Sequence, residues 1–213
     1  PVDIRPYSDK KHKNTDDYPF GGGAGMVMMA QPIFDALKNI DAGDKRIMYM
    51  SPRGRNIDMD LIKELSEEDE IILLCGHYEG VDQRVLDFWN MEEVSIGDYI
   101  LTGGELPAMV LIDAVARFIP DVLGSQESIA DESIYSGLLE CDQYTKPRNF
   151  EGMDVPEVLL SGNHKMIHLW QYENALRLTK ERRPDLFLTY LEKEKELSKD
   201  EKKILEKVVS KPL

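Results

Sequence analysis

The stretch Glu70–Gly80, EIILLCGHYEG, carries the clearest fold signal in the chain. Glu70–Cys75 is an almost continuous apolar run, which is typical of a strand buried on both faces in a parallel sheet. Gly76 and Gly80 end that run and indicate a loop at the carboxyl end of the strand. The stretch therefore predicts a buried parallel strand followed by a glycine-bearing loop.

Candidate strands and helices alternate around this stretch. The turn residues SPRGR at Ser51–Arg55 are expected to end the first strand, and Gly97 interrupts the last one. The long helix Glu105–Phe118 has a mostly apolar face that includes Met109 and Ile112. This alternation predicts the α/β class with a mainly parallel sheet. Strands are expected over Lys45–Met50, Glu70–Cys75 and Glu93–Leu101, and helices over Gln31–Ile40, Asp58–Ser66, Val81–Asn90 and Glu105–Phe118.

The sequence changes character after this α/β region. The segment GSQESIADESIYS has no hydrophobic period and few apolar side chains, which predicts a flexible linker. Beyond it, helices are expected over His164–Arg182 and Ser198–Val209, and the second begins with a capping box of Ser198 and Glu201. The sequence thus predicts an α/β domain over 1–123, an interdomain linker over 124–136 and a small helical domain over 137–213.

The net charge of −14 is unevenly distributed. Residues 61–145 contain 3 basic and 19 acidic side chains, so the remainder of the chain is close to neutral. The overall acidity argues against a nucleic-acid partner, but residues 146–183 are locally basic and could meet an anionic partner. Ordinary solvated surface is the alternative explanation. The basic residues there are Lys146, Arg148, Lys165, Arg177, Lys180, Arg182 and Arg183.

The cysteine count and the absence of long apolar runs predict a cytoplasmic protein. Cys75 and Cys141 are too few for a disulfide framework, which favours a reducing compartment. No apolar run approaches the ~20 residues of a membrane span, and no charged-then-apolar leader opens the sequence.

Glycine-bearing loops follow all three predicted strands: SPRGR, GHYEG and IGDYILTGGELP. Ligands of α/β sheets bind at the carboxyl ends of strands, where glycine lets the backbone approach a ligand closely. A tight turn explains each loop taken alone, whereas the three together indicate a pocket. Neither GxxxxGK[ST] nor a strand-linked GxGxxG is complete, so this pocket is neither a P-loop nor a Rossmann turn.

No metal site is expected from the histidines. His164 and His168 are spaced i, i+4 on a predicted helix but lack a third ligand, and a polar helix face explains them as well.

Six stretches that include the glycine loops form a recognisable set: Asp16–Met28, Leu73–Val85, Ser95–Met109, Ala116–Gly124, Gly137–Pro147 and Val155–His164. They closely resemble the TrmD family, the bacterial tRNA (guanine-N1)-methyltransferases of the SPOUT superfamily, in the family's order over almost the whole chain. The resemblance implies S-adenosyl-L-methionine as methyl donor and, as acceptor, N1 of the guanosine immediately 3′ of the anticodon in tRNA, a modification that supports reading-frame maintenance. It also implies a SPOUT-type sheet with a trefoil knot and a homodimer whose active site lies between subunits, and it leaves the role of Mg²⁺ open.

The donor site implied by the resemblance comprises residues of the three glycine loops. An adenine ring needs an apolar slot and backbone hydrogen bonds, which suits this composition. The implied donor-binding residues are Tyr49, Met50, Ser51, Pro52, Gly54, Gly76, Glu79, Ser95, Ile96, Gly97, Asp98, Tyr99, Ile100, Leu101, Gly103, Gly104 and Pro107.

Methylation at N1 needs a base that removes the guanine N1 proton and a cation that stabilises the charge building towards O6. Arg117 matches the family's catalytic arginine. The family's linker aspartate, which precedes a serine, is replaced by Glu132 in ADES, with Asp131 one residue earlier. We expect Glu132 to be the base, and Asp131 is the alternative because glutamate is one methylene longer.

Two further expectations follow from the resemblance. Family members begin with a strand and helix, including an ISLFP-like segment, that this sequence lacks before Pro1. The anticodon arm is expected to contact residues 146–183 and the KKHK segment Lys10–Lys13, with the target base splayed into the pocket and the linker ordering when tRNA arrives.

Two alternatives remain open. One is a SPOUT methyltransferase that acts on another RNA position, although the Gly21–Gly25 cluster and the helical C-terminal region favour TrmD. The other is a non-catalytic RNA-binding protein of the same fold, against which the presence of Arg117 and the linker carboxylates argues.

Overall fold

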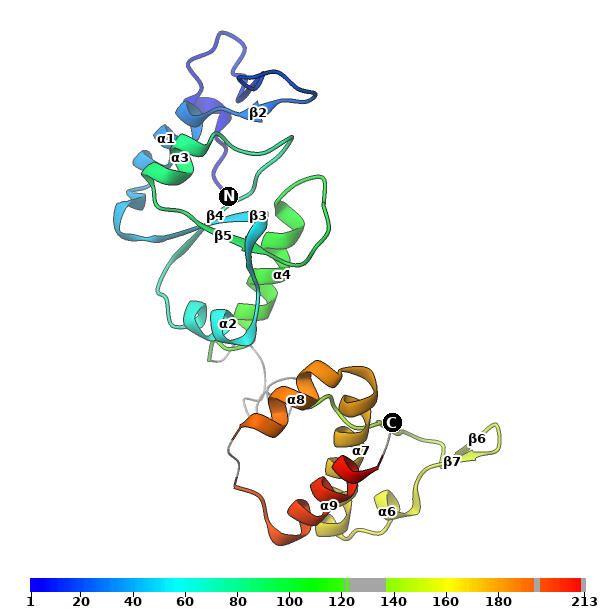
Figure 1. Cartoon of the computed structure of the whole chain (residues 1–213). Helices are drawn as coiled ribbons and strands as arrows, with labels where there is room; N and C mark the ends of the chain where they lie inside the picture. The colour runs from blue at the N-terminus through cyan, green and yellow to red at the C-terminus, as the bar shows by residue number, and fades with distance from the viewer. Residues whose placement is uncertain (121, 123–136, 194–195, 212–213) are drawn as a thin grey trace. The chain divides into compact units, whose positions relative to one another are not determined.

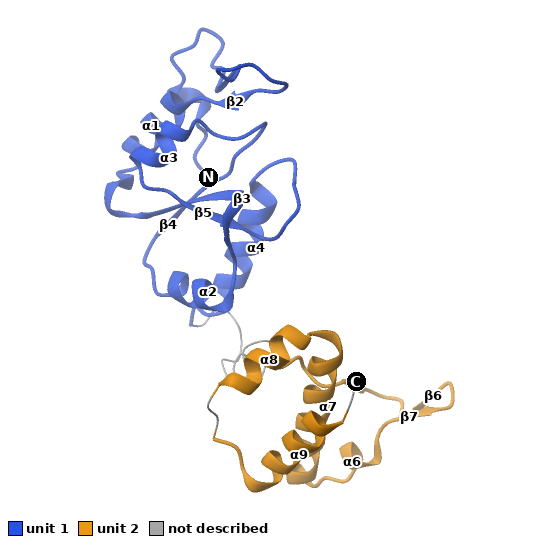
Figure 2. Cartoon of the chain, viewed as in Figure 1, with its two compact units in different colours: residues 1–124 blue, residues 125–213 orange. Residues whose placement is uncertain are grey.

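The computed structural model describes residues 1–120, 122, 137–193 and 196–211. The chain divides into two compact units, Pro1–Gly124 and Ser125–Leu213 (Figure 1, Figure 2). The predicted linker over 124–136 lies outside the described residues. None of the described helices is both long enough and apolar enough to cross a membrane.

The first unit contains the predicted parallel sheet, in the order β4-β3-β5. β3 (Arg46–Asn56) lies in the middle, and β4 (Ile71–Leu74) and β5 (Glu92–Ser95) pair with it in parallel. The apolar run after Glu70 is confirmed as a strand, and its pairing with β3 explains why it shows no polar alternation.

The predicted end of the first strand is wrong. β3 continues through SPRGR to Asn56, and Met50 and Arg55 both pair with Val94 of β5, so the intervening residues form an irregularity in the ladder. Gly54 permits this arrangement, because a Cβ there would lie 2.2 Å from the carbonyl carbon of Glu93. The turn-forming residues thus produce a bulge within a strand rather than its end.

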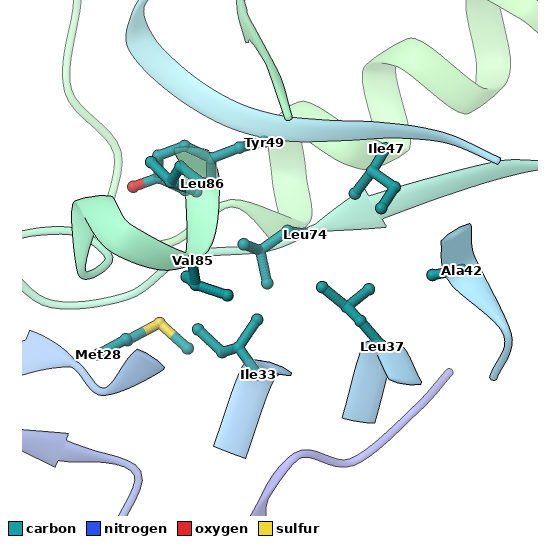
Figure 3. Close-up of a cluster of buried hydrophobic side chains, with 9 residues drawn as sticks. All are labelled: Met28, Ile33, Leu37, Ala42, Ile47, Tyr49, Leu74, Val85 and Leu86. Atoms are coloured by element: carbon teal, nitrogen blue, oxygen red, sulfur yellow. The ribbon is translucent and has the colours of Figure 1, made fainter. Parts of the chain in front are cut away.

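Helices cover both faces of the sheet. On β3, Ile47 and Tyr49 belong to one buried cluster and Met48 and Met50 to another, as the period of two along a strand requires. The first cluster packs against α1 and α3, and Figure 3 shows its α1 side chains pointing towards Leu74 of β4. The second packs against α2 and α4. The helices are α1 (Ala30–Asn39), α2 (Met59–Ser66), α3 (Gln83–Phe88) and α4 (Glu105–Ala116).

Short elements complete this unit. The 3-10 turns η1 (Arg5–Tyr7) and η2 (Ala42–Asp44) flank α1 in the sequence, and β1 (Asp16–Asp17) pairs with β2 (Val27–Met28) in an antiparallel hairpin. The backbone N–H of Glu79 donates to the Met26 carbonyl, so the strand that leaves the Gly21–Gly25 cluster is attached to the loop after β4.

The second unit is mainly helical. α7 packs against both α8 and α9, and the buried core is formed by Leu138, Leu176, Phe187, Tyr190 and Val208. The predicted capping box of Ser198 and Glu201 is present at the start of α9. The elements are the hairpin β6 (Asn149–Phe150) and β7 (Met153–Asp154), then α6 (Glu157–Leu160), α7 (His164–Arg182), α8 (Pro184–Glu192) and α9 (Lys199–Ser210).

Candidate functional site

A pocket of about 310 Å³ borders the ends of β4 and β5 and the middle of β3. Three chain segments line it: residues 49–52 within β3, and two loops that we call, in the order of the predicted glycine loops, the second loop (76–80) and the third loop (95–104). Because parallel strands β4 and β5 end on the same side of the sheet, the second and third loops meet there. Two of the three glycine-bearing segments thus meet at one pocket, together with residues 49–52 of β3.

All but two of the residues expected to bind the donor line this pocket. The exceptions are Gly54, which packs against the β5 backbone, and Asp98. Sequence reasoning missed five further lining residues that lie within or beside the same loops. The glycine spacing marked the loops but could not indicate which other side chains face inwards. The additional residues are His77, Tyr78, Gly80, Val94 and Thr102.

The second and third loops are held together by close backbone packing. The N–H of Gly104 donates to the Gly76 carbonyl at 2.8 Å, and His77 pairs with Gly103 in an isolated antiparallel bridge. A Cβ on Gly104 would lie 2.8 Å from the Cα of Cys75, so a side chain at 104 would push the loops apart. The pocket therefore depends on the absence of a side chain at this contact.

The described lining combines apolar surface with one carboxylate. Tyr49, Ile96 and Pro107 offer apolar walls, and Glu79 on the second loop is the carboxylate. Burial, and then the nearby Glu93 carboxylate, raise the pKa of the Tyr49 phenol, so Tyr49 stays neutral. A flat ring with a cationic substituent fits this composition.

Arg117 lies at the far end of α4 from this pocket. It is the half-buried residue that caps the carboxyl end of α4, where a cation interacts favourably with the helix dipole. Pro107, which lines the pocket, precedes it by ten residues, and a helical rise of 1.5 Å per residue places the two backbones about 15 Å apart. The pocket and the arginine of one chain therefore do not come together. The carboxylates Asp131 and Glu132 lie outside the described residues.

A larger cavity of about 1050 Å³ also opens on the first unit. Its lining includes many aliphatic side chains, among them Ile33, Ile72 and Leu111, as well as polar side chains such as His77 and Glu105. It does not include the Gly103–Gly104 pair or residues 49–52. Convergent backbone amides and a few polar groups distinguish a specific ligand site from an apolar hollow. We therefore assign the candidate site to the smaller pocket.

The two histidines of the second unit are both exposed. His168 Nε2 lies 3.1 Å from Glu201 Oε1 and links α7 to α9, and His164 begins α7. Within the described residues, no three His, Cys, Asp or Glu side chains converge as a metal site would require.

Several of the predicted basic residues form ion pairs or hydrogen bonds within the second unit. Lys165 pairs with Asp200 at 2.7 Å, Arg183 pairs with Asp185 at 2.6 Å, and the Lys180 ammonium donates to carbonyls at the end of α9, the Val208 carbonyl at 2.7 Å among them. Among the residues that the structure describes, Lys146, Arg177 and Arg182 have no ion-pair partner, and Arg148 lies 3.6 Å from Glu157.

The fold and the pocket together define an α/β protein with a candidate ligand site at the ends of parallel strands, followed in the chain by a helical unit. The family model described as tRNA (Guanine-1)-methyltransferase TrmD matches residues 1–189, and the chain belongs to this family.

Three relatives named tRNA (guanine-N(1)-)-methyltransferase illustrate the similarity. The one from Ruminiclostridium cellulolyticum is 56% identical over 189 residues, which cover 87% of this chain and 81% of the relative. The one from Alkaliphilus oremlandii is 52% identical, with 99% of this chain and 86% of the relative covered. The one from Clostridioides difficile is 53% identical, with 86% and 81% covered.

Proposed function

We propose that the protein transfers a methyl group from S-adenosyl-L-methionine to N1 of the guanosine immediately 3′ of the anticodon in tRNA, and thereby supports reading-frame maintenance in the cytoplasm. Its membership of the TrmD family supports the reaction. The observation that carries the proposal at the level of this chain is that nearly all the residues expected to bind the donor line one pocket. A SPOUT-type trefoil knot is part of the proposal.

The pocket suits the donor chemically. When bound, the donor supplies an electrophilic methyl group on a sulfonium. The apolar walls formed by Tyr49, Ile96 and Pro107 suit an adenine ring, and backbone groups of Gly76 and Gly104 lie beside them. The Glu79 carboxylate suits the positive charges of the donor's methionine moiety.

The chain's own ionisable groups complete the chemistry. Glu132 removes the proton from guanine N1 so that its lone pair can attack, and Asp131 is the alternative base. Arg117 stabilises the negative charge that develops towards O6. The proposal includes no step that requires Mg²⁺, and an assay with and without a chelator tests that point.

The active site is proposed to form between two copies of the chain. The separation of about 15 Å along α4 supports this, because Arg117 and the pocket of one chain lie at opposite ends of that helix. The outer face of α4 is also apolar and exposed, with Met109 at 63% and Ile112 at 56%, and a homodimer would bury it. The exposed apolar residues of α4 are Leu106, Met109, Val110 and Ile112.

The tRNA partner is proposed to bind through the helical domain over 137–213 and the Lys10–Lys13 segment. Lys146, Arg177 and Arg182 are the cations best suited to phosphates, since none of them is used in an ion pair within the described residues. The linker over 124–136 is proposed to order around the splayed guanine when tRNA and donor are both bound.

Donor-dependent methylation of a tRNA transcript tests the proposal. The wild-type chain is expected to produce 1-methylguanosine in a transcript with G after the anticodon and none when that G is replaced by A. Methylation at another position would favour a different SPOUT methyltransferase, and no methylation of any transcript would favour a non-catalytic RNA-binding protein.

Mixed subunits test the shared site. At a donor concentration well below the dissociation constant of the Gly104→Ala chain, the Gly104→Ala and Arg117→Ala chains are each expected to show little activity alone. A refolded equimolar mixture should recover about a quarter of wild-type activity, because half of the dimers are mixed and each of those contains one intact composite site. No recovery would contradict a site shared between subunits.

A further inference from the structure

A side-chain hydrogen bond links the second loop, which lines the candidate pocket, to the start of α4. The Nε2 atom of His77 lies 2.7 Å from Oε1 of Glu105. Because an ionised carboxylate can only accept, the imidazole is the donor. The Glu105 backbone N–H and then the His77 ring hold the pKa of the Glu105 carboxyl below its usual value, so the carboxylate is ionised at neutral pH.

The hydrogen bond between His77 and Glu105 requires glycine at position 103. A Cβ on Gly103 would lie 2.4 Å from Oε2 of Glu105 and 2.8 Å from Cε1 of His77. The carboxylate and the imidazole thus meet directly over the Gly103 backbone, which the bridge with His77 already holds against the second loop.

The position of the bond couples it to the shape of the pocket. His77 belongs to the second loop and Glu105 follows the third, and these two loops line the pocket together. Both side chains are about half exposed, at 48% and 56%, so the bond adds little to the buried core. Its geometric effect is to hold the second loop, which includes Glu79, at a set distance from the start of α4.

We propose that His77 and Glu105 are positioning residues that preorganise the pocket for the methyl donor, by tying the second loop to the amino-terminal end of α4. This inference rests on the proposed function, since the ligand concerned is the donor. Neither residue is assigned contact with reacting atoms. Loss of the bond therefore weakens donor binding and leaves the affinity for tRNA unchanged, because preorganisation lowers the cost of ordering the loops when the ligand binds.

The test is calorimetric titration of the full chain with S-adenosylhomocysteine, the demethylated donor. Glu105→Ala and His77→Ala are each expected to raise the dissociation constant about fivefold to tenfold, the effect of one charge-assisted hydrogen bond at a partly exposed site. The double variant should be no weaker than either single variant, because both remove the same bond. Glu105→Gln, which keeps an acceptor oxygen, should bind within about twofold of wild type.

Matched controls separate positioning from general stability. Glu173→Ala removes an ion pair of the same length, 2.7 Å to Lys207, in the second unit and should leave donor affinity unchanged. The Michaelis constant for tRNA and the melting temperature should stay near wild type in all the single variants. His77→Ala leaves α4 intact, so it tests the bond even where Glu105→Ala perturbs the helix.

Several results would overturn the inference. Unchanged affinity in both alanine variants, additive losses in the double variant, a glutamine variant as weak as the alanine variant, or an equal loss in Glu173→Ala would each do so. A wild-type chain that binds no S-adenosylhomocysteine would instead overturn the proposed function itself. Wild-type binding with unaffected variants would overturn only the role of His77 and Glu105.

Discussion

Replacing Gly104 by alanine should displace one side of the pocket, by a distance that follows from the contacts of Gly104. The added Cβ would lie 2.8 Å from the Cα of Cys75 and 2.8 Å from the backbone nitrogen of Gly76, whereas ordinary contacts lie at 3.4 Å or more. The φ angle at Gly104 is −81°, which alanine adopts readily, so the effect is one of contact and not of backbone strain. The second loop must therefore move by about half an ångström or the helix start must shift.

The magnitude follows from overpacking at a rigid contact. Forced shifts of this kind cost about 1–3 kcal/mol of folding free energy. A loss of that size lowers the melting temperature by roughly 2–4 °C per kcal/mol for a chain of this length. Displacement of the second loop should also weaken binding of S-adenosylhomocysteine by at least about tenfold, because Glu79 and the Gly76 backbone line the same pocket.

Gly43→Ala is the matched control. A Cβ at Gly43 would meet nothing within 4 Å, and this glycine does not have a positive φ. Its replacement should leave donor binding unchanged and stability equal or slightly higher, by up to about 1 kcal/mol. Thermal unfolding followed by circular dichroism and calorimetric titration measure both quantities. A Gly104→Ala chain with wild-type stability and wild-type donor affinity would refute the packing argument.

Four further predictions concern other parts of the molecule. Met109→Lys, on the exposed apolar face of α4, should convert a dimer to a monomer with its fold retained, as measured by light scattering, and a dimer of unchanged affinity would count against the proposed interface. Glu132→Gln should abolish most turnover while Asp131→Asn retains it, and the reverse pattern would identify Asp131 as the base. The Ser198 hydroxyl and backbone N–H, with His168, lower the pKa of the Glu201 carboxyl. The folded chain should therefore be more stable than Glu201→Gln by about 0.3–1 kcal/mol at pH 7, and this difference should be lost as the pH falls through the folded-state pKa of Glu201. Urea unfolding of both chains at pH 7 and pH 3 would detect the change. Lys165, Lys180 and Arg183 are used internally, and in the Lys10–Lys13 segment Lys10 pairs with Asp17 and Lys13 donates to the Ser8 carbonyl. About five of the proposed phosphate-binding cations per subunit remain, so the logarithm of tRNA affinity should fall with the logarithm of salt concentration with a slope of about −4, whereas a slope of about −8 would contradict this count.

The elements with strong local signals could be predicted from the sequence. The run after Glu70 forms β4, and α7 has the predicted bounds His164–Arg182, with the side chain of Asn163 accepting a hydrogen bond from the Met166 N–H at its start. Capping and hydrophobic runs are properties of neighbouring residues, so one sequence is enough to detect them.

The missed features depend on contacts between distant residues. The extension of β3 through SPRGR arises from pairing with β5, which turn propensity does not encode. The apolar face of α4 that contains Met109 and Ile112 is exposed, and Leu111 and Val115 face the core instead, because the helix is apolar on both sides. Likewise Lys180 contributed to a predicted basic surface, yet it caps α9 through a contact 28 residues away in the sequence.

In the candidate site, too, features with a local sequence signal could be predicted, and features that depend on distant contacts could not. The glycine loops could be recognised from the sequence because each follows a predicted strand, and the resemblance to a family indicated individual residues. The position of His77 depends on its contacts with Gly103 and Glu105, which no local pattern contains. Gly54 was grouped with the donor residues, although its place in the fold is the contact with β5.

A crystal structure of the full chain with S-adenosylhomocysteine tests the central claim most directly. The account predicts that the ligand occupies the pocket of about 310 Å³, between Tyr49, Gly76 and Gly104, with Glu79 close to its amino group. Ligand bound instead in the larger cavity beside Ile33, Ile72 and Leu111 would contradict the assignment of the donor site to the smaller pocket.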